Sequence, residues 1–190
     1  MMIAVIWARF GPYHLARLRG LADRGAAAGY AVVGLEIARQ DHYAWDQQAG
    51  AEGFTRHTVF PEARYDALTP RQIRRGVAQA LDRIQPDAVT INGWSVPEAR
   101  AALAWGRRRG VITVLMSETK EDDGDGPRRW WKEALKGWLA RRAAAALVGG
   151  RKQVDYLVKL GFPRARIFLG YDAIDNDYFA RETAQVREQQ

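Results

Sequence analysis

The chain has 190 residues, of which 47% are hydrophobic and 11% aromatic, enough to build one domain of ordinary size with a full core. It contains no cysteine, which excludes disulfides and thiolate metal sites, and its three histidines share no spacing typical of metal ligands. No apolar run reaches the ~18 residues needed to cross a bilayer, and residues 1–7 lack the features of a secretory signal. We therefore expect a cytoplasmic protein without a bound metal.

The net charge of +7 lies entirely after Glu62, because the first 62 residues hold six arginines and six acidic residues. The excess gathers in three basic stretches, at 71–75, 107–109 and 127–142. A basic face attracts phosphate groups, whether on nucleic acid, anionic lipid or a nucleotide. For the first two stretches we favour the simpler interpretation of solvated helix faces, since charge alone specifies function poorly.

Segments with the pattern of strands and helices alternate from the start of the chain. A nearly continuous apolar run at 2–7 predicts a central strand, and leucines at helical spacing predict a helix at 13–29 that ends at a glycine. Further strands are expected at 30–38 and 54–60, the second at an edge of the sheet. The long connection between them, at 39–53, is expected to be functional or mobile.

The second half of the chain continues the alternation. A helix at 69–85 begins with a capping box of Thr69 and Gln72, and a helix at 95–110 repeats that pattern with Ser95 and Glu98. Strands separated by helices imply right-handed crossovers and a parallel sheet. The sequence therefore predicts an α/β, Rossmann-like, mostly parallel sheet with helices on both faces. The remaining expected elements are strands at 86–92, 111–116, 144–148 and 165–169 and a helix at 151–161.

Ligands of such sheets bind beyond the carboxyl ends of the strands, so the residues that follow each strand are candidates for the site. Gly11 lets the backbone turn closely before a helix whose N-terminal amides suit an anion. The chain lacks the G-x-G-x-x-G motif there, which disfavours an NAD or FAD pocket. His14 and His42 are candidate bases, although a histidine in a loop is more often a hydrogen-bonding residue.

Two later loops carry further candidates. Gly150 precedes a helix whose first turn holds Arg151 and Lys152, which suits an anion, and a plain strand-to-helix turn explains the same residues equally well. Asn92 and Trp94 place an amide and an indole at the rim, a pairing common at sugar sites. For Trp94 alone, packing over the sheet is the simpler alternative.

An acidic loop at 117–126 follows the strand expected at 111–116. Loops of this kind lie at the surface, so most of its carboxylates are expected to be solvated. Glu118 is the exception, because it is the carboxylate nearest the strand end. It is a candidate base or sugar ligand.

The basic stretch at 127–142 is also rich in tryptophan. On a helix, one apolar stripe flanked by lysines and arginines consists of Trp131, Leu135, Trp138 and Leu139. This pattern is typical of a helix lying in a membrane interface, with Trp130, Trp131 and Trp138 at the depth of anionic headgroups. The alternative is a stripe that packs on the domain's own core, with cationic side chains flanking it.

The segment at 147–179 resembles the end of the N-terminal domain in retaining glycosyltransferases of the GT4 family, which have the GT-B fold. In those proteins a helix with a Tyr-Leu pair runs to a Leu-Gly, and a strand then leads to an Asn-Gly-Val-Asp pattern closed by Phe. Here Leu160, Gly161, Asp175 and Phe179 fall on that pattern in register, with "DAID" in place of Asn-Gly-Val-Asp. The preceding residues agree in the order of strands and helices.

The resemblance implies two Rossmann-like domains with the active site between them, one binding the acceptor and the other the nucleotide-sugar donor. Residues 1–170 are then the acceptor-binding domain and 171–190 the interdomain linker and tail, with the donor domain absent from the chain. The implied reaction moves a sugar, with retention, to a lipid-linked or saccharide acceptor, using the nucleotide sugar as co-substrate and no cofactor or metal. We expect the isolated chain to be inactive.

The resemblance also assigns roles to the residues that follow the strands. Those expected to face the donor phosphates are Gly11, Gly150, Arg151 and Lys152. Those expected to bind the acceptor are His14, Asn92 and Trp94. Many relatives have a histidine after the strand that matches 111–116, where this chain has its two catalytic candidates, Ser117 and Glu118.

A function of another class is a stand-alone, non-catalytic Rossmann-like module that holds a phosphorylated ligand or nucleic acid on its basic face. We regard nucleic acid as the less favoured partner. The transferase interpretation instead places the tryptophan-rich helix on the inner face of the membrane, which makes the protein peripheral rather than membrane-spanning. A second α/β domain encoded after Gln190 would favour the transferase.

Overall fold

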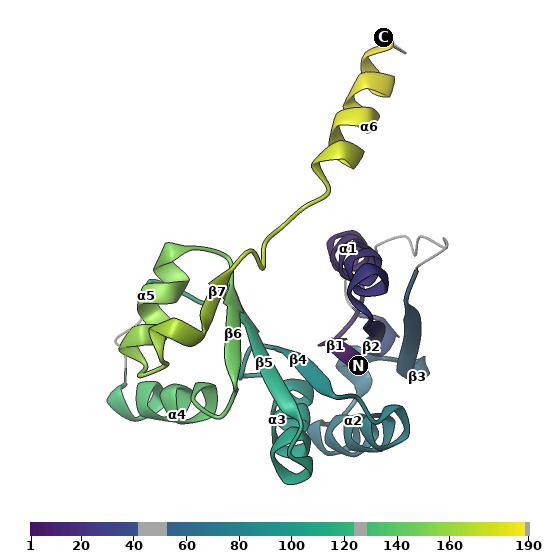
Figure 1. Ribbon diagram of the computed structural model, residues 1–190. Helices are drawn as coiled ribbons and strands as arrows, with labels where there is room; N and C mark the ends of the chain where they lie inside the picture. Colours follow the sequence, from purple (N-terminus) through teal and green to yellow (C-terminus); the bar gives the residue numbers. More distant parts are fainter. Residues whose placement is uncertain (42–52, 124–128, 189–190) are drawn as a thin grey trace.

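The computed structural model describes residues 1–41, 53–123 and 129–188 (Figure 1). Most of the connection predicted at 39–53, including His42, lies outside the described residues, as do residues 124–128 of the acidic loop and the start of the tryptophan-rich stretch.

Seven parallel strands form one sheet in the order β3-β2-β1-β4-β5-β6-β7. The predicted fold class is confirmed, with β1 inside the sheet and β3 at its edge. The strands are β1 (Met2–Trp7), β2 (Ala31–Gln40), β3 (Thr55–Arg64), β4 (Ala88–Asn92), β5 (Ile112–Ser117), β6 (Ala145–Val148) and β7 (Ile167–Leu169). The helices are α1 (Pro12–Ala28), α2 (Pro70–Ile84), α3 (Pro97–Arg109), α4 (Trp130–Ala140), α5 (Arg151–Lys159) and α6 (Asn176–Glu188).

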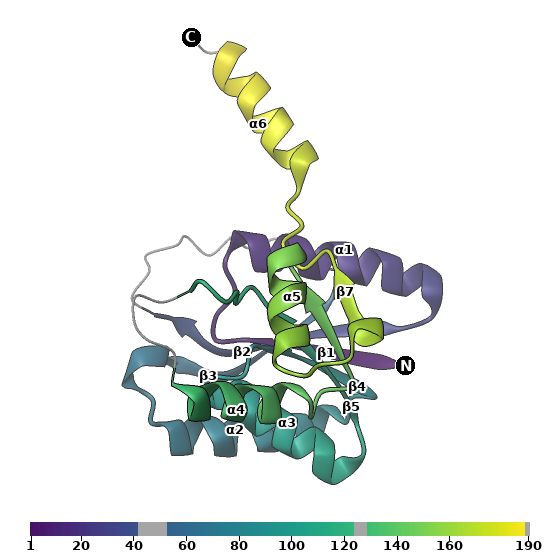
Figure 2. The same cartoon turned by 90° about the vertical axis from the view of Figure 1, so that its left-hand side faces the viewer.

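The two faces of the sheet carry different helices (Figures 1 and 2). On one face, α2, α3, α4 and α5 enclose the larger core, to which Leu81, Leu115 and Tyr156 contribute fully buried side chains. On the other face, the smaller core gathers Trp7 and Leu18 beneath α1. Burial of apolar area on both faces stabilises the sheet, and most of it lies on the face covered by four helices.

The local signals for α1 and α2 are confirmed. Thr69 is the N-cap of α2, its Oγ1 accepting from the N–H of Gln72 at 3.3 Å, while its own N–H donates to Oε1 of Gln72 at 2.9 Å. Gly29 ends α1 in the left-handed conformation, with φ of 75°.

The capping box predicted for Ser95 and Glu98 is wrong. Pro97 occupies the first position of α3 and Val96 is the N-cap, so Glu98 is the second helical residue and cannot close a box. Its side chain turns inward instead and is fully buried, where Oε2 accepts from the hydroxyl of Tyr65 at 2.9 Å.

The tail expected at 171–190 as a linker contains an additional helix, α6, which extends away from the sheet (Figures 1 and 2). Tyr171 is nonetheless buried, and the indole N–H of Trp7 donates to its hydroxyl at 3.1 Å. The packed part of the chain therefore continues one residue beyond 170. Within the described residues, no helix has the length and apolar character needed to cross a bilayer.

Candidate functional site

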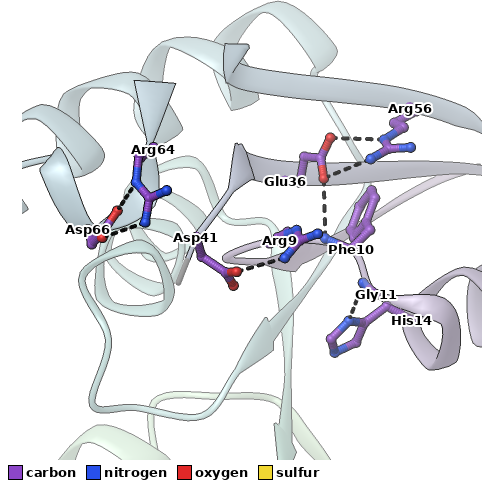
Figure 3. A network of polar contacts seen from close by, with 9 residues as sticks. All are labelled: Arg9, Phe10, Gly11, His14, Glu36, Asp41, Arg56, Arg64 and Asp66. Atoms are coloured by element: carbon purple, nitrogen blue, oxygen red, sulfur yellow. Dashed lines mark hydrogen bonds and ion pairs between the residues drawn. The ribbon is translucent and has the colours of Figure 1, made fainter. Parts of the chain in front are cut away.

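The loop after β1 is held by a buried carboxylate on β2 (Figure 3). Glu36 is fully buried, and its Oε2 accepts from the backbone N–H of Phe10 at 3.2 Å. Arg56 donates to both of its oxygens, at 2.9 and 3.1 Å, and the hydroxyl of Thr58 donates at 2.7 Å. A buried carboxylate loses its hydration, so it is stable only with several hydrogen-bond donors and a positive charge beside it. Strands β2 and β3 thus fix the backbone at the start of α1.

His14 closes the N-terminus of α1. Its Nδ1 accepts from the N–H of Gly11 at 3.0 Å, so the proton of the neutral ring lies on Nε2 (Figure 3). Burial, and to a smaller extent the charge of Arg17, lower the pKa of His14 to about 4. At neutral pH the ring of His14 is therefore uncharged. It can donate a hydrogen bond from Nε2 but adds no positive charge to attract a phosphate.

Arg17, one turn beyond His14 on α1, connects the ends of several strands. Its guanidinium lies 3.5 Å from Oδ1 of Asp172, which follows β7, and 4.0 Å from Oε1 of Glu118, which follows β5. It also lies over the ring of Tyr171, with Cζ 4.8 Å from the centroid. We call Arg17, Glu118, Tyr171 and Asp172 the strand-end cluster.

The two carboxyl groups of the cluster influence each other. The pKa of Glu118 is raised by burial first and then by the hydrogen bond and charge of Asp172, whereas Arg17 lowers it. The side chain of Glu118 keeps 58% of its surface exposed, so a ligand can still reach it. A reachable carboxylate with a raised pKa is a stronger base than an ordinary one.

Gly149 and Gly150, at the end of β6, border the cluster. A Cβ on Gly149 would overlap Oδ2 of Asp172, so the absence of a side chain makes room for that carboxylate. Gly150 is the N-cap of α5 and makes no side-chain capping bond, which leaves the first amides of the helix uncapped by side chains. Lys152 is exposed and pairs with Asp122 of the acidic loop at 3.2 Å.

Two predicted site residues lie elsewhere than expected. Trp94 is buried in the larger core, since its ring removes more apolar area from water there than at a rim. Ser117 is also buried, and its Oγ accepts from the N–H of Thr119 at 3.2 Å, which stabilises the turn after β5. These placements do not fit the acceptor contact predicted for Trp94 or the catalytic role predicted for Ser117.

The other candidate residues do not all lie together in the structure. Glu118 and Gly150 lie at neighbouring strand ends, connected by the side-chain amide of Gln153, which donates to the carbonyl of Glu118 at 3.2 Å. Asn92 points its Nδ2 to the buried Glu98 at 3.1 Å. Arg151 is exposed on the first turn of α5.

Arg17 and Asp172 were missed by sequence reasoning. Arg17 lies three residues after His14 and so shares its helix face, a signal that was present in the sequence. Asp172 follows a predicted strand end, but its segment was interpreted as linker.

An apolar groove of about 840 Å³ adjoins the cluster on the same face of the sheet as α1. Arg17 and Tyr171 lie in its wall, so the cluster and the groove form one continuous surface. The sheet residues that line it include Val5, Thr90, Val114, Met116 and Leu147. Across the residues that the structure describes, no group of three or more His, Asp or Glu side chains is placed to hold a metal ion.

The structure resembles several solved structures. It matches UDP-GlcNAc 2-epimerase from Methanocaldococcus jannaschii with a TM-score of 0.52 at 9% identity, covering 89% of this chain and 45% of that one. It matches sucrose-phosphate synthase from Thermosynechococcus elongatus with a TM-score of 0.58 at 12% identity, covering 100% and 98%. A third match, MnaA of S. aureus with UDP, has a TM-score of 0.57 at 11% identity, covering 93% and 47%.

At these identities the likeness shows the fold alone, and the chain spans less than half the length of the epimerases it matches. No curated protein sequence matches the chain. The sequence family described as glycosyl transferase 4-like domain matches residues 15–169. With that match over most of its length and the Rossmann-like fold of the GT-B glycosyltransferases, the chain belongs to the glycosyl transferase 4-like domain family.

Proposed function

We propose that this chain is the acceptor-binding half of a glycosyltransferase that moves a sugar from a nucleotide-sugar donor to an acceptor hydroxyl, with retention of configuration. The observation that carries this proposal is the strand-end cluster, because Arg17, Glu118 and Asp172 meet at the carboxyl edge of a parallel sheet. Ligands of such sheets bind at that edge. Family membership supports the sugar-transfer chemistry.

The carboxylates of the cluster suit an acceptor with several hydroxyl groups. Ionised Glu118 and Asp172 accept hydrogen bonds from hydroxyls, and such charge-assisted bonds are stronger than neutral ones. The raised pKa of Glu118 also lets this group take the proton of the attacking hydroxyl. Arg17 lies against both carboxylates and keeps them together despite their like charges. Holding the hydroxyl in one orientation itself lowers the barrier.

In this proposal a second domain, in addition to residues 1–190, binds the nucleotide of the donor. Gly11, Gly150, Arg151 and Lys152 face that domain and approach the donor diphosphate. The amides at the start of α5 support this role, because a helix N-terminus without a side-chain cap favours an anion. These dipoles and cations stabilise the charge that develops on the leaving diphosphate.

The apolar groove favours a lipid-linked acceptor over a free saccharide. It begins at Arg17 and Tyr171 and continues along β1, β4 and β5 beneath α1. A sugar held at the strand-end cluster would place an attached alkyl chain in this groove, where burial of each methylene contributes about 0.8 kcal/mol.

The acceptor role is tested by NMR titration of the labelled chain with octyl glucoside below its micelle concentration, with glucose and with UDP. We expect octyl glucoside to shift amides beside Glu118 and Asp172 and to bind more tightly than glucose. Glu118→Gln or Asp172→Asn should weaken octyl glucoside about tenfold, the loss of one charge-assisted hydrogen bond. Glu121→Gln, in the same loop and paired with Lys159, is the control and should bind as the parent does.

Two outcomes would contradict the proposal. One is UDP bound at the strand-end cluster while octyl glucoside leaves these residues unchanged, which would favour a module for phosphorylated ligands. The other is robust hydrolysis of a nucleotide sugar by residues 1–190 alone, because the proposed donor site lies on a separate domain.

A further inference from the structure

Helix α4 turns its tryptophans away from the core. Trp131, Leu135 and Trp138 lie on one face of the helix and remain 46%, 47% and 48% exposed. The buried face consists instead of Gly137 and Ala140. The interpretation of the tryptophan stripe as a core contact is therefore wrong for these three residues.

The close contact of α4 with the body of the protein explains this orientation. A Cβ on Gly137 would lie 2.5 Å from the carbonyl oxygen of Leu160, so only a glycine lets the helix approach the end of α5 this closely. A tryptophan would not fit on that side of the helix. Trp130, at the start of α4, is more exposed still, at 81%.

A groove of about 380 Å³ lies between α3 and α4, directly beside this exposed face. Its apolar lining comes from Trp138 and Leu139 of α4 and from Leu103 and Ala104 of α3. Its basic residues come from both helices: Arg100, Arg107 and Arg108 from α3, and Arg142 from the end of α4. Arg107 and Arg108 belong to the stretch that we interpreted as a solvated helix face; they are exposed, and they share this groove with Trp138.

Two arginines of this groove donate to backbone carbonyls, Arg100 to Trp94 at 3.0 Å and Arg142 to Trp138 at 2.6 Å, which leaves their charge in place. The guanidinium of Arg142 lies over the ring of Trp138, with Cζ 3.0 Å from the centroid. Its pKa is lowered by desolvation first and then by repulsion from Arg107 and Arg141. Arg109 pairs with Asp82 at 2.7 Å, whereas Arg107 and Arg142 have no acidic partner within the described ranges 1–41, 53–123 and 129–188.

We propose that this Trp–Arg surface, made of Trp131, Leu135, Trp138 and the four groove arginines, docks on a bilayer that contains anionic lipids. Tryptophan and leucine side chains enter the headgroup region, and the guanidinium groups bind lipid phosphates bidentately. The charge of the groove is complementary to that surface, and its arginines can bind phosphates because no carboxylate of the described residues pairs with Arg107 or Arg142. The proposal goes beyond sugar transfer and uses no residue of the strand-end cluster.

The test is co-sedimentation of the chain with vesicles of equal parts phosphatidylcholine and phosphatidylglycerol, compared with pure phosphatidylcholine. We expect binding to the anionic vesicles alone, weakened by added salt. The triple variant Arg107→Ala, Arg108→Ala, Arg142→Ala should bind about tenfold to hundredfold more weakly, since each basic residue near the surface contributes about 1 kcal/mol. The double variant Trp131→Ala, Trp138→Ala should lose about tenfold or more.

Matched variants separate this surface from general effects of charge and hydrophobicity. Arg71→Ala, Arg74→Ala, Arg75→Ala removes three exposed arginines from α2, and Val158→Ala, Phe168→Ala removes two exposed apolar side chains elsewhere. Both should bind anionic vesicles within about twofold of the parent, as expected for residues outside the contact. Circular dichroism should show that all variants remain folded, since every substituted side chain is at least partly exposed.

Three results would overturn the proposal. The first is no binding of the parent chain to anionic vesicles. The second is an equal loss in the α2 variant, which would mean that net charge alone is responsible. The third is a parent chain that self-associates in gel filtration and that Trp131→Ala, Trp138→Ala makes monomeric, without any vesicle binding, which would assign the surface to a second copy.

Discussion

Four helices cover one face of the sheet and α1 lies on the other (Figure 1). Beside α1 there is a groove of about 840 Å³. Adjacent residues of β5 show the difference. Leu115 is 1% exposed in the larger core, and Val114, on the opposite side of the strand, lines the groove. The well-covered face stabilises the domain, while the face with the groove leads to the strand-end cluster. Stability and the proposed binding therefore depend on different sides of the same strands.

The largest effect should come from the covered face. Leu115→Ala removes a fully buried side chain and should lower the free energy of unfolding by about 2–5 kcal/mol. Urea denaturation measures this loss. A loss below about 1 kcal/mol would mean that the face covered by four helices contributes no more to stability than the face with the groove.

His14, beside the groove, makes stability depend on acid. Its pKa is about 4 when folded and near 6.5 when unfolded, so protons favour the unfolded chain. Stability should fall as the pH drops from about 6.5 and reach a full loss on the order of 3 kcal/mol below about 4. Denaturation of the parent and His14→Gln across this pH range measures the difference. The control variant His57→Gln should lose stability at low pH as the parent does. An NMR titration midpoint near 6.5 for His14 would contradict this explanation.

A substitution at Gly149, beside the strand-end cluster, should change ligand binding rather than the stability of the domain. Gly149→Ala displaces the carboxylate of Asp172, so the pKa of Glu118 should fall toward its ordinary value and octyl glucoside should bind about tenfold more weakly. A carboxyl NMR titration follows the first effect. Val158→Ala, which removes an exposed apolar side chain from α5, is the control and should change neither quantity.

The smallest effect should come from the groove itself. Val114→Ala shortens a half-buried side chain and should cost roughly 1 kcal/mol or less, because little packing surrounds the removed methyl groups. The measurement is the same urea denaturation used for Leu115→Ala, which serves as its partner on the same strand. Equal losses for the two variants would show that the groove is filled in solution.

Much of the fold was predictable because its signals are local. The apolar run at 2–7, the glycine after α1 and the capping box at Thr69 each lie within one element, and the structure contains all three. Parallel pairing followed from the alternation of strands and helices. The box predicted for Ser95 and Glu98 failed because Pro97 begins the helix one residue later than the pattern indicated.

The candidate site was predicted only in part. The rule that ligands bind at strand ends identified His14, Glu118 and Gly150, but the same rule also selected Trp94 and Ser117, which turn inward. Nothing local distinguishes an indole at a rim from one packed on the sheet. Arg17 and Asp172 lie 155 residues apart, and their proximity arises only when α1 and β7 take their places on one sheet.

By itself the sequence determined the order of strands and helices, the parallel sheet and the resemblance to a glycosyltransferase family, because hydrophobic periodicity and capping act over a few consecutive residues. Only the tertiary structure decided which face of α4 meets the core, which arginines lie beside its tryptophans and which carboxylates share Arg17. These depend on contacts between distant segments: Gly137 sets how closely α4 approaches the end of α5, and Gly149 leaves room for the side chain of Asp172.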